Sequence, residues 1–289
     1  MKIKILIPVY NDFQSVSKLL NDINFTIANL KVEFSVIIIN DASIENQDID
    51  VSGIDKINSI KIINMKNNQG HTRCIATGLK YIFEKEEFDY VIPMDGDGED
   101  RPAEIEKFIE FLKYDNSRPI TGERIKRSEG LIFKISYSIH KLITFIFTGH
   151  SIKFGNFTCL PKTTAEKMIN EKATWSSFSG SLAKVEKNRS TIPSIRGSRY
   201  FGPSKMSFFN LIKHSLSIIA VFKTNVIIRS ILFFLIYIFL ISENLNYVTS
   251  IPLIGVLALA ISVLAISKRE NISELNDSLS NIKNIDEIK

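Results

Sequence analysis

Four carboxylate side chains lie within six residues of the sequence, in the run Asp95-Gly-Asp97-Gly-Glu99-Asp100. Like charges this close repel one another and destabilise a fold unless a cation or a basic ligand compensates them. The intervening glycines let the backbone turn closely while Asp95 and Asp97 point to one side. Hard oxygen ligands of this kind suit Mg²⁺ or Mn²⁺, which usually keep open positions for substrate phosphates. The run therefore predicts a metal site.

Two other interpretations use the same residues. A calcium loop of the helix-loop-helix type takes ligands at its positions 1, 3, 5 and 12, which here fall on Asp95, Asp97, Glu99 and Glu106. That loop requires glycine where Asp100 stands, and a strand rather than a helix leads into it. A solvated acidic turn without a ligand is the plainer alternative, because D-x-D is a short and common string.

The elements around this run predict an α/β domain. Short runs rich in Ile and Val suit strands of a mostly parallel, covered sheet, and they occupy residues 2–9, 33–40, 59–65 and 89–94. Helical periodicity separates them, from Phe13 to Leu30 and again from Cys74 to Phe83. Polar residues cluster where these strands end, which is where open α/β sheets bind their ligands.

Composition excludes several classes of protein. The chain has 289 residues, of which 45% are apolar and 23% charged, so it is not disordered, collagenous or a disulfide scaffold. Residues 1–117 carry 13 basic and 20 acidic side chains, residues 118–229 carry 19 and 5, and residues 230–289 carry 4 and 6. A uniform basic coat, as nucleic-acid binding requires, is absent from the sequence. The two cysteines, Cys74 and Cys159, are expected to be reduced thiols.

The C-terminal part predicts a membrane hairpin. From Asn244 to Ser267 there are 24 uncharged residues, enough to cross about 30 Å of hydrocarbon as a helix. The preceding apolar window, Ser230–Ser242, has only 13 residues, so it spans only if the helix starts near Thr224 and Arg229 snorkels. A buried hairpin of a soluble protein is the alternative.

Flanking charges predict the orientation of this hairpin. Basic residues stand before the first segment, at Lys223 and Arg229, and after the second, at Lys268 and Arg269, whereas the connection carries only Glu243. The positive-inside rule then places both ends on the cytoplasmic side. We therefore expect a multi-pass membrane protein with a cytoplasmic catalytic domain.

Five motifs in fixed order carry a resemblance to a known family. They are IPVYND (7–12), IINDAS (38–43), NNQGHTRCIATGL (67–79), PMDGDGEDRPAEI (93–105) and ITGERIKR (120–127). Together they resemble the nucleotide-sugar domain of glycosyltransferase family 2, with its GT-A fold. Within that family, the chain is most similar to the polyprenyl-phosphate glycosyltransferases of the dolichol-phosphate mannose synthase group. The resemblance covers nearly the whole chain.

The resemblance implies roles for the residues of the first four motifs. Pro8, Tyr10, Asp12 and Asp41 match positions that line the nucleotide base and ribose. Asp95 and Asp97 match the metal-binding D-x-D next to the diphosphate, and Glu99 matches the position of a third metal ligand. From the residues alone, Asp12 and Asp41 could instead cap helices. His71, in the N-x-G-H turn, is expected to be structural.

The basic middle of the chain matches the phosphate-handling part of the family. Arg124 and Arg127 match a basic pair that binds phosphate oxygens, although both could be solvated charges. Family members usually carry G-D-F-R in the next block, where this chain has Gly155-Asn156-Phe157-Thr158. Asn156 cannot accept a proton at neutral pH, so general-base catalysis from this position is in doubt. A lipid monophosphate acceptor, which is already ionised, is weakly favoured.

The stretch before the hairpin completes the predicted acceptor site. Arg199, Ser204 and Lys205 match an R-x-x-G-x-S-K motif that the family places at the bilayer surface, next to the acceptor phosphate. A positive membrane-facing patch without a specific lipid is the alternative. Residues 272–285 have apolar residues at helical spacing, which predicts a surface or partner-binding helix, with a frayed tail as the alternative.

These observations together predict an inverting, metal-dependent glycosyltransferase. Its expected parts are a GT-A catalytic domain (1–203), an amphipathic helix (204–223), two transmembrane helices (224–267) and a cytoplasmic tail (268–289). Its expected catalytic residues are Asp97, Arg124 and Asn156, its donor is a nucleoside diphosphate sugar, and its acceptor is polyprenyl phosphate. Transfer to a hydroxyl of a lipid-linked glycan or envelope polymer, and a catalytically silent membrane scaffold, remain open. A homo-oligomer is also open.

Overall fold

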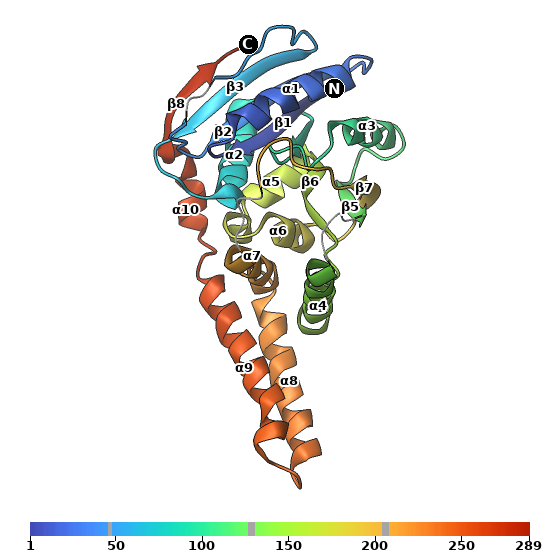
Figure 1. Ribbon diagram of the computed structural model, residues 1–289, viewed down its shortest axis with the longest axis vertical. Coiled ribbons are helices and arrows are strands. Elements are labelled where there is room, and N and C mark those ends of the chain that lie inside the picture. The colour runs from blue at the N-terminus through green and yellow to red at the C-terminus, as the bar shows by residue number, and fades with distance from the viewer. Residues whose placement is uncertain (46–47, 127–130, 204–207) are drawn as a thin grey trace. The chain divides into compact units, whose positions relative to one another are not determined.

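The runs rich in Ile and Val form strands in the computed structural model, which describes residues 1–45, 48–126, 131–203 and 208–289 (Figure 1). Branched side chains favour this pleated, covered surface. The strands are β1 (Lys2–Val9), β2 (Glu33–Asn40), β3 (Ile57–Met65), β4 (Tyr90–Pro93), β5 (Ile120–Lys126), β6 (Phe154–Pro161), β7 (Ser190–Ile195) and β8 (Ile282–Glu287). Within the described residues they form one sheet, in the order β7-β5-β6-β4-β1-β2-β3-β8.

The helices connect these strands or follow them. Those of the first half are α1 (Phe13–Ile27), α2 (His71–Lys85), α3 (Ile105–Leu112) and α4 (Leu131–Thr148). Those of the second half are α5 (Lys162–Ile169), α6 (Phe178–Val185), α7 (Phe208–Ala220), α8 (Lys223–Ile241), α9 (Tyr247–Ser267) and α10 (Ile272–Asn276). Short 3₁₀ turns occupy Pro102–Glu104, Lys172–Trp175 and Ser278–Asn281.

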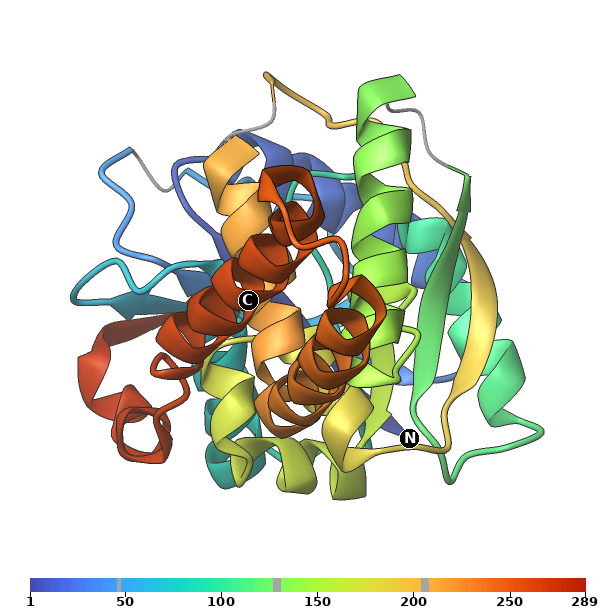
Figure 2. The same cartoon turned by 90° about the horizontal axis from the view of Figure 1, so that it is seen from below.

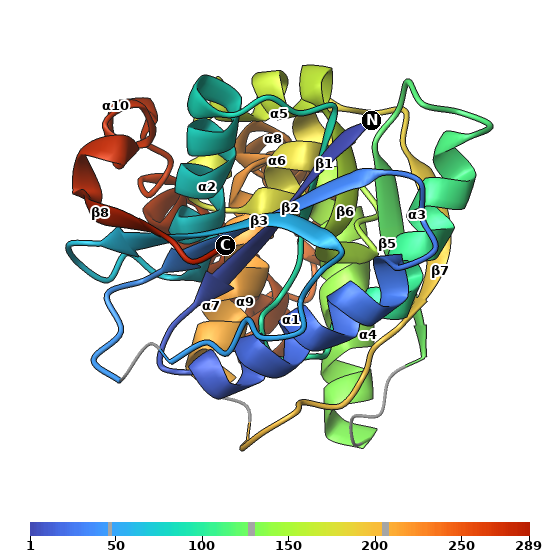
Figure 3. The same cartoon turned by 90° about the horizontal axis from the view of Figure 1, so that it is seen from above.

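The predicted α/β class with a mostly parallel sheet is confirmed. Strands β4, β1, β2 and β3 run parallel to one another, while β6 and β8 join antiparallel. Alternate residues of the central strands feed two cores, one with α1 and α3 and the other with α2, α5 and α6, so helices cover both faces (Figure 3). Cys74 and Cys159 are free and fully buried within these cores, as expected of reduced thiols.

The amphipathic pattern of α1 shows how the sequence builds this layer. Val16, Leu19, Leu20 and Ile23 recur at helical spacing and are all fully buried against the sheet. Burying one such side chain contributes about 1.5–3 kcal/mol. Because β1 ends where α1 begins, this packing fixes the turn between them, and the residues at that turn belong to the site described below.

The chain divides into two compact units. The first contains residues 1–128, 153–205 and 271–289, and therefore the whole sheet. The second contains residues 129–152 and 206–270, with α4, α7, α8 and α9. Within it, α8 and α9 run side by side (Figures 1 and 2), with contacts that include Val226 and Val263.

Both predicted apolar segments are helices. α8 and α9 are long and apolar enough to cross a membrane, and most of their apolar side chains are exposed, for example Leu235, Phe239 and Ile254. Arg229 donates hydrogen bonds to the backbone carbonyls of Phe145 and Ile146, near the end of α4. Its snorkelling, on which a full span of α8 depends, stays a prediction. Carbonyls at a helix C-terminus attract a cation.

The C-terminal tail differs from the prediction. Residues 282–287 form a strand on the edge of the sheet rather than a helix, and only Ile272–Asn276 is α-helical. Leu275 is fully buried with Ala76 and Trp175, and the Trp175 indole donates a 2.7 Å hydrogen bond to Glu274. The helical spacing was misleading because contacts with distant parts of the chain determine the conformation here.

Candidate active site

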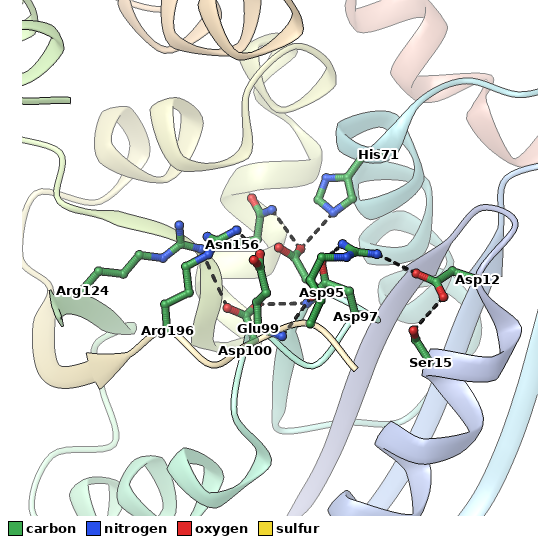
Figure 4. A network of polar contacts seen from close by, with 11 residues as sticks. Asp12, Ser15, His71, Asp95, Asp97, Glu99, Asp100, Arg124, Asn156 and Arg196 are labelled. Atoms are coloured by element: carbon green, nitrogen blue, oxygen red, sulfur yellow. Dashed lines mark hydrogen bonds and ion pairs between the residues drawn. The ribbon is translucent and has the colours of Figure 1, made fainter. Parts of the chain in front are cut away.

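The acidic turn lies at the carboxyl end of the central strands, where the sequence predicts it. Strand β4 ends at Pro93, beside β1, whose end leads into the turn at Asn11. Asn11 has a positive φ of 50°, a conformation that Asn tolerates better than most residues. Asp95 and Asp97 therefore lie near Asp12, with the side chains of the cluster converging (Figure 4).

Asp95 is held by two side chains from other elements. The imidazole Nε2 of His71, the first residue of α2, lies 2.9 Å from its Oδ1. The amide of Asn156, in β6, donates to the same oxygen at 3.5 Å. The position that carries an Asp in the family thus holds a donor that faces the predicted metal ligand (Figure 4).

Three arginines compensate the remaining carboxylates. Arg199 donates to Asp97 at 2.5 Å and to Asp12 at 2.8 Å, so it joins the acidic turn to the turn after β1. Arg196 pairs with Glu99, and Arg124 lies 3.8 Å from Asp100. The buried Nε of Arg199 has no hydrogen-bond partner within the described residues, which leaves donor capacity unused.

Burial and mutual repulsion perturb the pKa values of these groups. Burial would raise the pKa of Asp95, but His71, followed by Arg124 and Arg196, outweighs it and holds the pKa below its usual range. Burial, followed by repulsion from Asp95, raises the pKa of Asp97 and raises that of Asp100 to about 7. Burial lowers the pKa of His71, but the charge of Asp95 outweighs it and raises that pKa. The site therefore favours an ionised Asp95.

Two glycines allow the close packing around the cluster. Gly98 has a φ of +87°, and a Cβ there would meet the Tyr200 ring, which packs over the turn. Gly155 lies where a Cβ would come within 3.1 Å of the Arg124 guanidinium. Larger residues at either position would displace the groups that surround the carboxylates.

Asp41 holds a second turn of the site. Its two carboxylate oxygens accept hydrogen bonds from the backbone N–H groups of Gln69 and Gly70, at 2.7 and 2.9 Å. Its side chain is thus used at the start of α2, in the manner of the capping alternative, and it is 3% exposed. Pro8 lies in β1, and Tyr10, which follows that strand, is 45% exposed. The nucleotide-binding roles of these residues remain predictions.

Some of the predicted site lies outside the described residues. Arg127, Ser204 and Lys205 fall there, so their roles in acceptor binding stay predictions. The structure brings together Asp12, Asp95, Asp97, Glu99, Arg124, Asn156 and Arg199.

Three residues of the cluster were not among the predicted site residues. His71, which we expected to be structural, contacts Asp95. Arg196 and Asp100 pair with predicted residues. The repulsion within the acidic run signals that it needs cations, but nothing in the local sequence identifies which arginines supply them.

The carboxylates fit the predicted metal in part. Asp95 and Asp97 offer hard oxygen atoms on either side of Gly96, as Mg²⁺ or Mn²⁺ requires. The Glu99 carboxylate pairs with Arg196, and its role as a third metal ligand stays a prediction. No three His, Cys, Asp or Glu side chains within the described ranges converge as a complete metal site. The chemistry of Asp95 and Asp97 therefore fits such an ion, and their role as ligands stays a prediction.

Comparison with known proteins gives a family match over much of the chain. The sequence profile of glycosyl transferase family 2 matches residues 4–176. The chain is 27% identical, over 218 residues, to the undecaprenyl-phosphate 4-deoxy-4-formamido-L-arabinose transferase of Salmonella choleraesuis strain SC-B67. That match covers 73% of this chain and 64% of the relative, so it spans less than two thirds of the relative's length.

Solved structures of similar fold contain nucleoside diphosphate sugars, the class of donor that the sequence predicts. The structure of S. aureus TarS in complex with UDP-GlcNAc superposes with a TM-score of 0.54 at 15% identity, over 96% of this chain and 87% of that one. A mannosyltransferase from Pyrobaculum calidifontis in complex with GDP-Man and Mn²⁺ superposes with a TM-score of 0.53 at 12% identity, over 96% and 74%. At these identities, the likeness establishes the GT-A fold.

Proposed function

The chain belongs to glycosyl transferase family 2, and from that membership we propose that it transfers a sugar from a nucleoside diphosphate sugar to a polyprenyl phosphate, with inversion. The observation that carries the proposal is the cluster of Asp95 and Asp97 with basic side chains, in a chain that also has two bilayer-length helices. The Salmonella relative is named for an undecaprenyl-phosphate acceptor, which supports a polyprenyl phosphate as the lipid.

Asp95 and Asp97 would hold Mg²⁺ or Mn²⁺ on the donor diphosphate. The Mn²⁺ in the mannosyltransferase structure supports a divalent ion. When bound, the ion would supply Lewis-acid stabilisation of the charge that develops on the leaving diphosphate. Arg199 compensates Asp97 and has a spare donor, so it would contribute positive charge next to the same phosphates.

The acceptor side suits a phosphate rather than a hydroxyl. Asn156 occupies the position of the family's acidic residue and cannot take a proton. A phosphate monoester has a second pKa of about 6 and needs no base near neutral pH, so positioning can supply much of the catalysis. Arg124, within the cluster, would orient this phosphate, together with Arg127, Ser204 and Lys205.

The course of the chain supports an even number of membrane crossings. Residues 206–270 leave the first unit at Lys205 and return to it at Asn271, and β8 then joins its sheet. If α8 and α9 each cross the bilayer, both ends of the hairpin lie on the side of the catalytic unit. Basic residues at both ends support a cytoplasmic location for that side, by the positive-inside rule.

A lipid-product assay tests the proposed function. The full chain in membranes receives a long-chain polyprenyl phosphate and, in turn, a panel of labelled UDP-, GDP- and CDP-sugars. The expected product is labelled, soluble in chloroform and released by mild acid. Asp97→Asn should lower its rate by about 10²- to 10³-fold, since a group that stabilises leaving-group charge is lost.

The controls separate transfer to a lipid phosphate from transfer to a hydroxyl and from a catalytically silent scaffold. Glu87→Gln changes an exposed carboxylate far from the site and should retain full activity. Label in a polymer with none in the lipid would indicate a hydroxyl acceptor. Absence of product with every donor, together with no calorimetric binding of any of them, would indicate a silent scaffold and refute the proposal.

A further inference from the structure

Residues that follow the apolar helices return to the first unit and add strand β8 to its sheet. Strand β8 pairs antiparallel with β3, in a register that sets Ile63 opposite Ile285. Backbone hydrogen bonds extend the contact at both ends: the Lys66 N–H donates to the Asn281 carbonyl at 2.7 Å, and the Ile60 N–H donates to the Lys289 carbonyl at 2.9 Å. Strand β8 is thus the edge of the sheet, and its first residue, Ile282, lies opposite Met65 at the end of β3.

A chain of hydrogen bonds runs from β8 into the site. Asp286 accepts from the side-chain amide of Asn64 at 2.6 Å, and the Asn64 oxygen accepts from the amide of Asn40 at 2.7 Å. The Asn40 oxygen in turn accepts from the backbone N–H of Ser43 at 3.0 Å. Asn40 and Asn64 are 2% and 6% exposed, so each has little access to water as a substitute partner.

The groups at the two ends of this series of hydrogen bonds fix the direction of donation along it. A backbone N–H can only donate, and an ionised carboxylate can only accept, so both amides between them have one orientation. Asp286 is the last acceptor in this series of hydrogen bonds. Without the Asp286 carboxylate, the NH₂ group of the buried Asn64 loses its acceptor. The orientation of the Asn64 side chain toward Asn40 is then no longer fixed.

The turn at residues 40–43, which these hydrogen bonds hold, carries residues of the predicted donor site. Asn40 immediately precedes Asp41, which holds the Gln69–Gly70 turn, and Ala42 has a positive φ of 56°. Ser43 Oγ accepts a 2.9 Å hydrogen bond from the Asn11 N–H, so the turn after β1 is tied to the same network. An Ala in this backbone conformation is strained and needs such support.

A polar cavity of about 280 Å³ lies beside this turn. Its walls include Asn40, Ser43, Asn64, Lys66, Lys283 and Asp286, which come from β2, β3 and β8. Amide, hydroxyl and charged groups of this kind match the hydrogen-bonding edge of a nucleobase or ribose.

We propose that β8 forms one wall of the donor-nucleotide site and that Asp286 is a positioning residue, which holds the Asn40–Ser43 turn in its binding conformation through Asn64 and Asn40. The inference rests on the proposed function, because it takes the donor to be a nucleoside diphosphate sugar. It means that residues beyond the membrane hairpin help to set donor affinity.

Nucleotide titration of the full chain in detergent tests the inference. Calorimetry with Mn²⁺ and, separately, UDP, GDP, CDP and dTDP identifies the tightest nucleotide for the unaltered chain. Asp286→Ala should raise its Kd about tenfold, which corresponds to the loss of one charged hydrogen bond of about 1.4 kcal/mol. Asp286→Asn keeps an acceptor oxygen and should keep Kd within about threefold. The matched control is Glu287→Ala, an exposed carboxylate one residue further along β8, which should leave Kd unchanged.

The number of sites per chain separates positioning from a loss of folded protein. A raised Kd with one site per folded chain supports the inference. Fewer sites at unchanged Kd, unchanged binding by Asp286→Ala, or an equal effect of Glu287→Ala would each overturn it while leaving the proposed function intact. If the unaltered chain binds none of the four nucleotides, the proposed function fails, and the inference fails with it.

Discussion

At the scale of single residues, Arg199 joins two turns of the cluster, because its guanidinium binds both Asp12 and Asp97. Arg199→Ala leaves two half-buried carboxylates unpaired, and we expect kcat/KM in the lipid-product assay to fall about 10- to 100-fold. Arg199→Lys keeps the charge but cannot bridge both partners with a planar fork, so an intermediate loss is expected. Equal activity of the unaltered chain, Arg199→Ala and Arg199→Lys would contradict a role for the contacts of Arg199 with Asp12 and Asp97.

Asn156 tests the nature of the acceptor. Its amide faces Asp95, and Asn156→Asp would place a second carboxylate against that group. If the acceptor is an ionised phosphate, a new base brings no benefit and the added repulsion should lower kcat by about tenfold or more. Initial rates with polyprenyl phosphate at pH 7 measure this effect. A rise in kcat would instead contradict the expectation that the phosphate acceptor needs no base.

At the scale of elements, Glu86 joins β1 and β3, the two strands that flank β2. Located directly after α2, it pairs with Lys4 of β1 at 2.7 Å and Lys61 of β3 at 2.8 Å, and its side chain is 10% exposed. Burial alone would raise the pKa of Glu86, but the hydrogen bonds and charges of the two lysines outweigh burial and lower it. Because the pKa is lower in the folded state, ionised Glu86 stabilises the fold at neutral pH, and this stabilisation is lost as the pH falls below about 4.3.

Glu86→Gln should therefore lower the free energy of unfolding at pH 7 by about 1–3 kcal/mol. The difference from the unaltered chain should shrink as the pH falls toward the folded-state pKa. Denaturant unfolding in detergent, followed by the fluorescence of the single and buried Trp175, measures it. Glu87→Gln is the matched control, since Glu87 is 86% exposed and should show no such change. A difference that is constant with pH would contradict the ion-pair interpretation.

The elements that could be predicted from the sequence are those whose local residue pattern matches their burial in the fold. The Ile- and Val-rich runs of β1 to β4 and the one-sided pattern of α1 specify their structures locally. Strand β8 could not be predicted, because Ile282 and Ile285 have helical spacing and the strand depends on pairing with β3. The candidate site divides in the same way: D-x-D is a local string, whereas the pairing of Asp97 with Arg199 depends on the folded chain.

At the scale of the whole molecule, the return of the chain to its own sheet makes the membrane topology testable. Both native cysteines are fully buried, so a cysteine introduced at an exposed position should be the main labelled thiol. Asn244→Cys lies in the connection between α8 and α9, and Glu287→Cys lies in β8. If both helices cross the bilayer, these positions are on opposite sides.

We therefore expect a membrane-impermeant maleimide to label Asn244→Cys in intact cells and Glu287→Cys only after the membrane is opened. The unaltered chain is the control for labelling of Cys74 and Cys159. Labelling of both variants only in opened cells would show that the apolar helices do not cross the bilayer. The reversed pattern would place the sheet, and with it the Asp95 cluster, on the outer face, where cytoplasmic nucleotide sugars would not reach it.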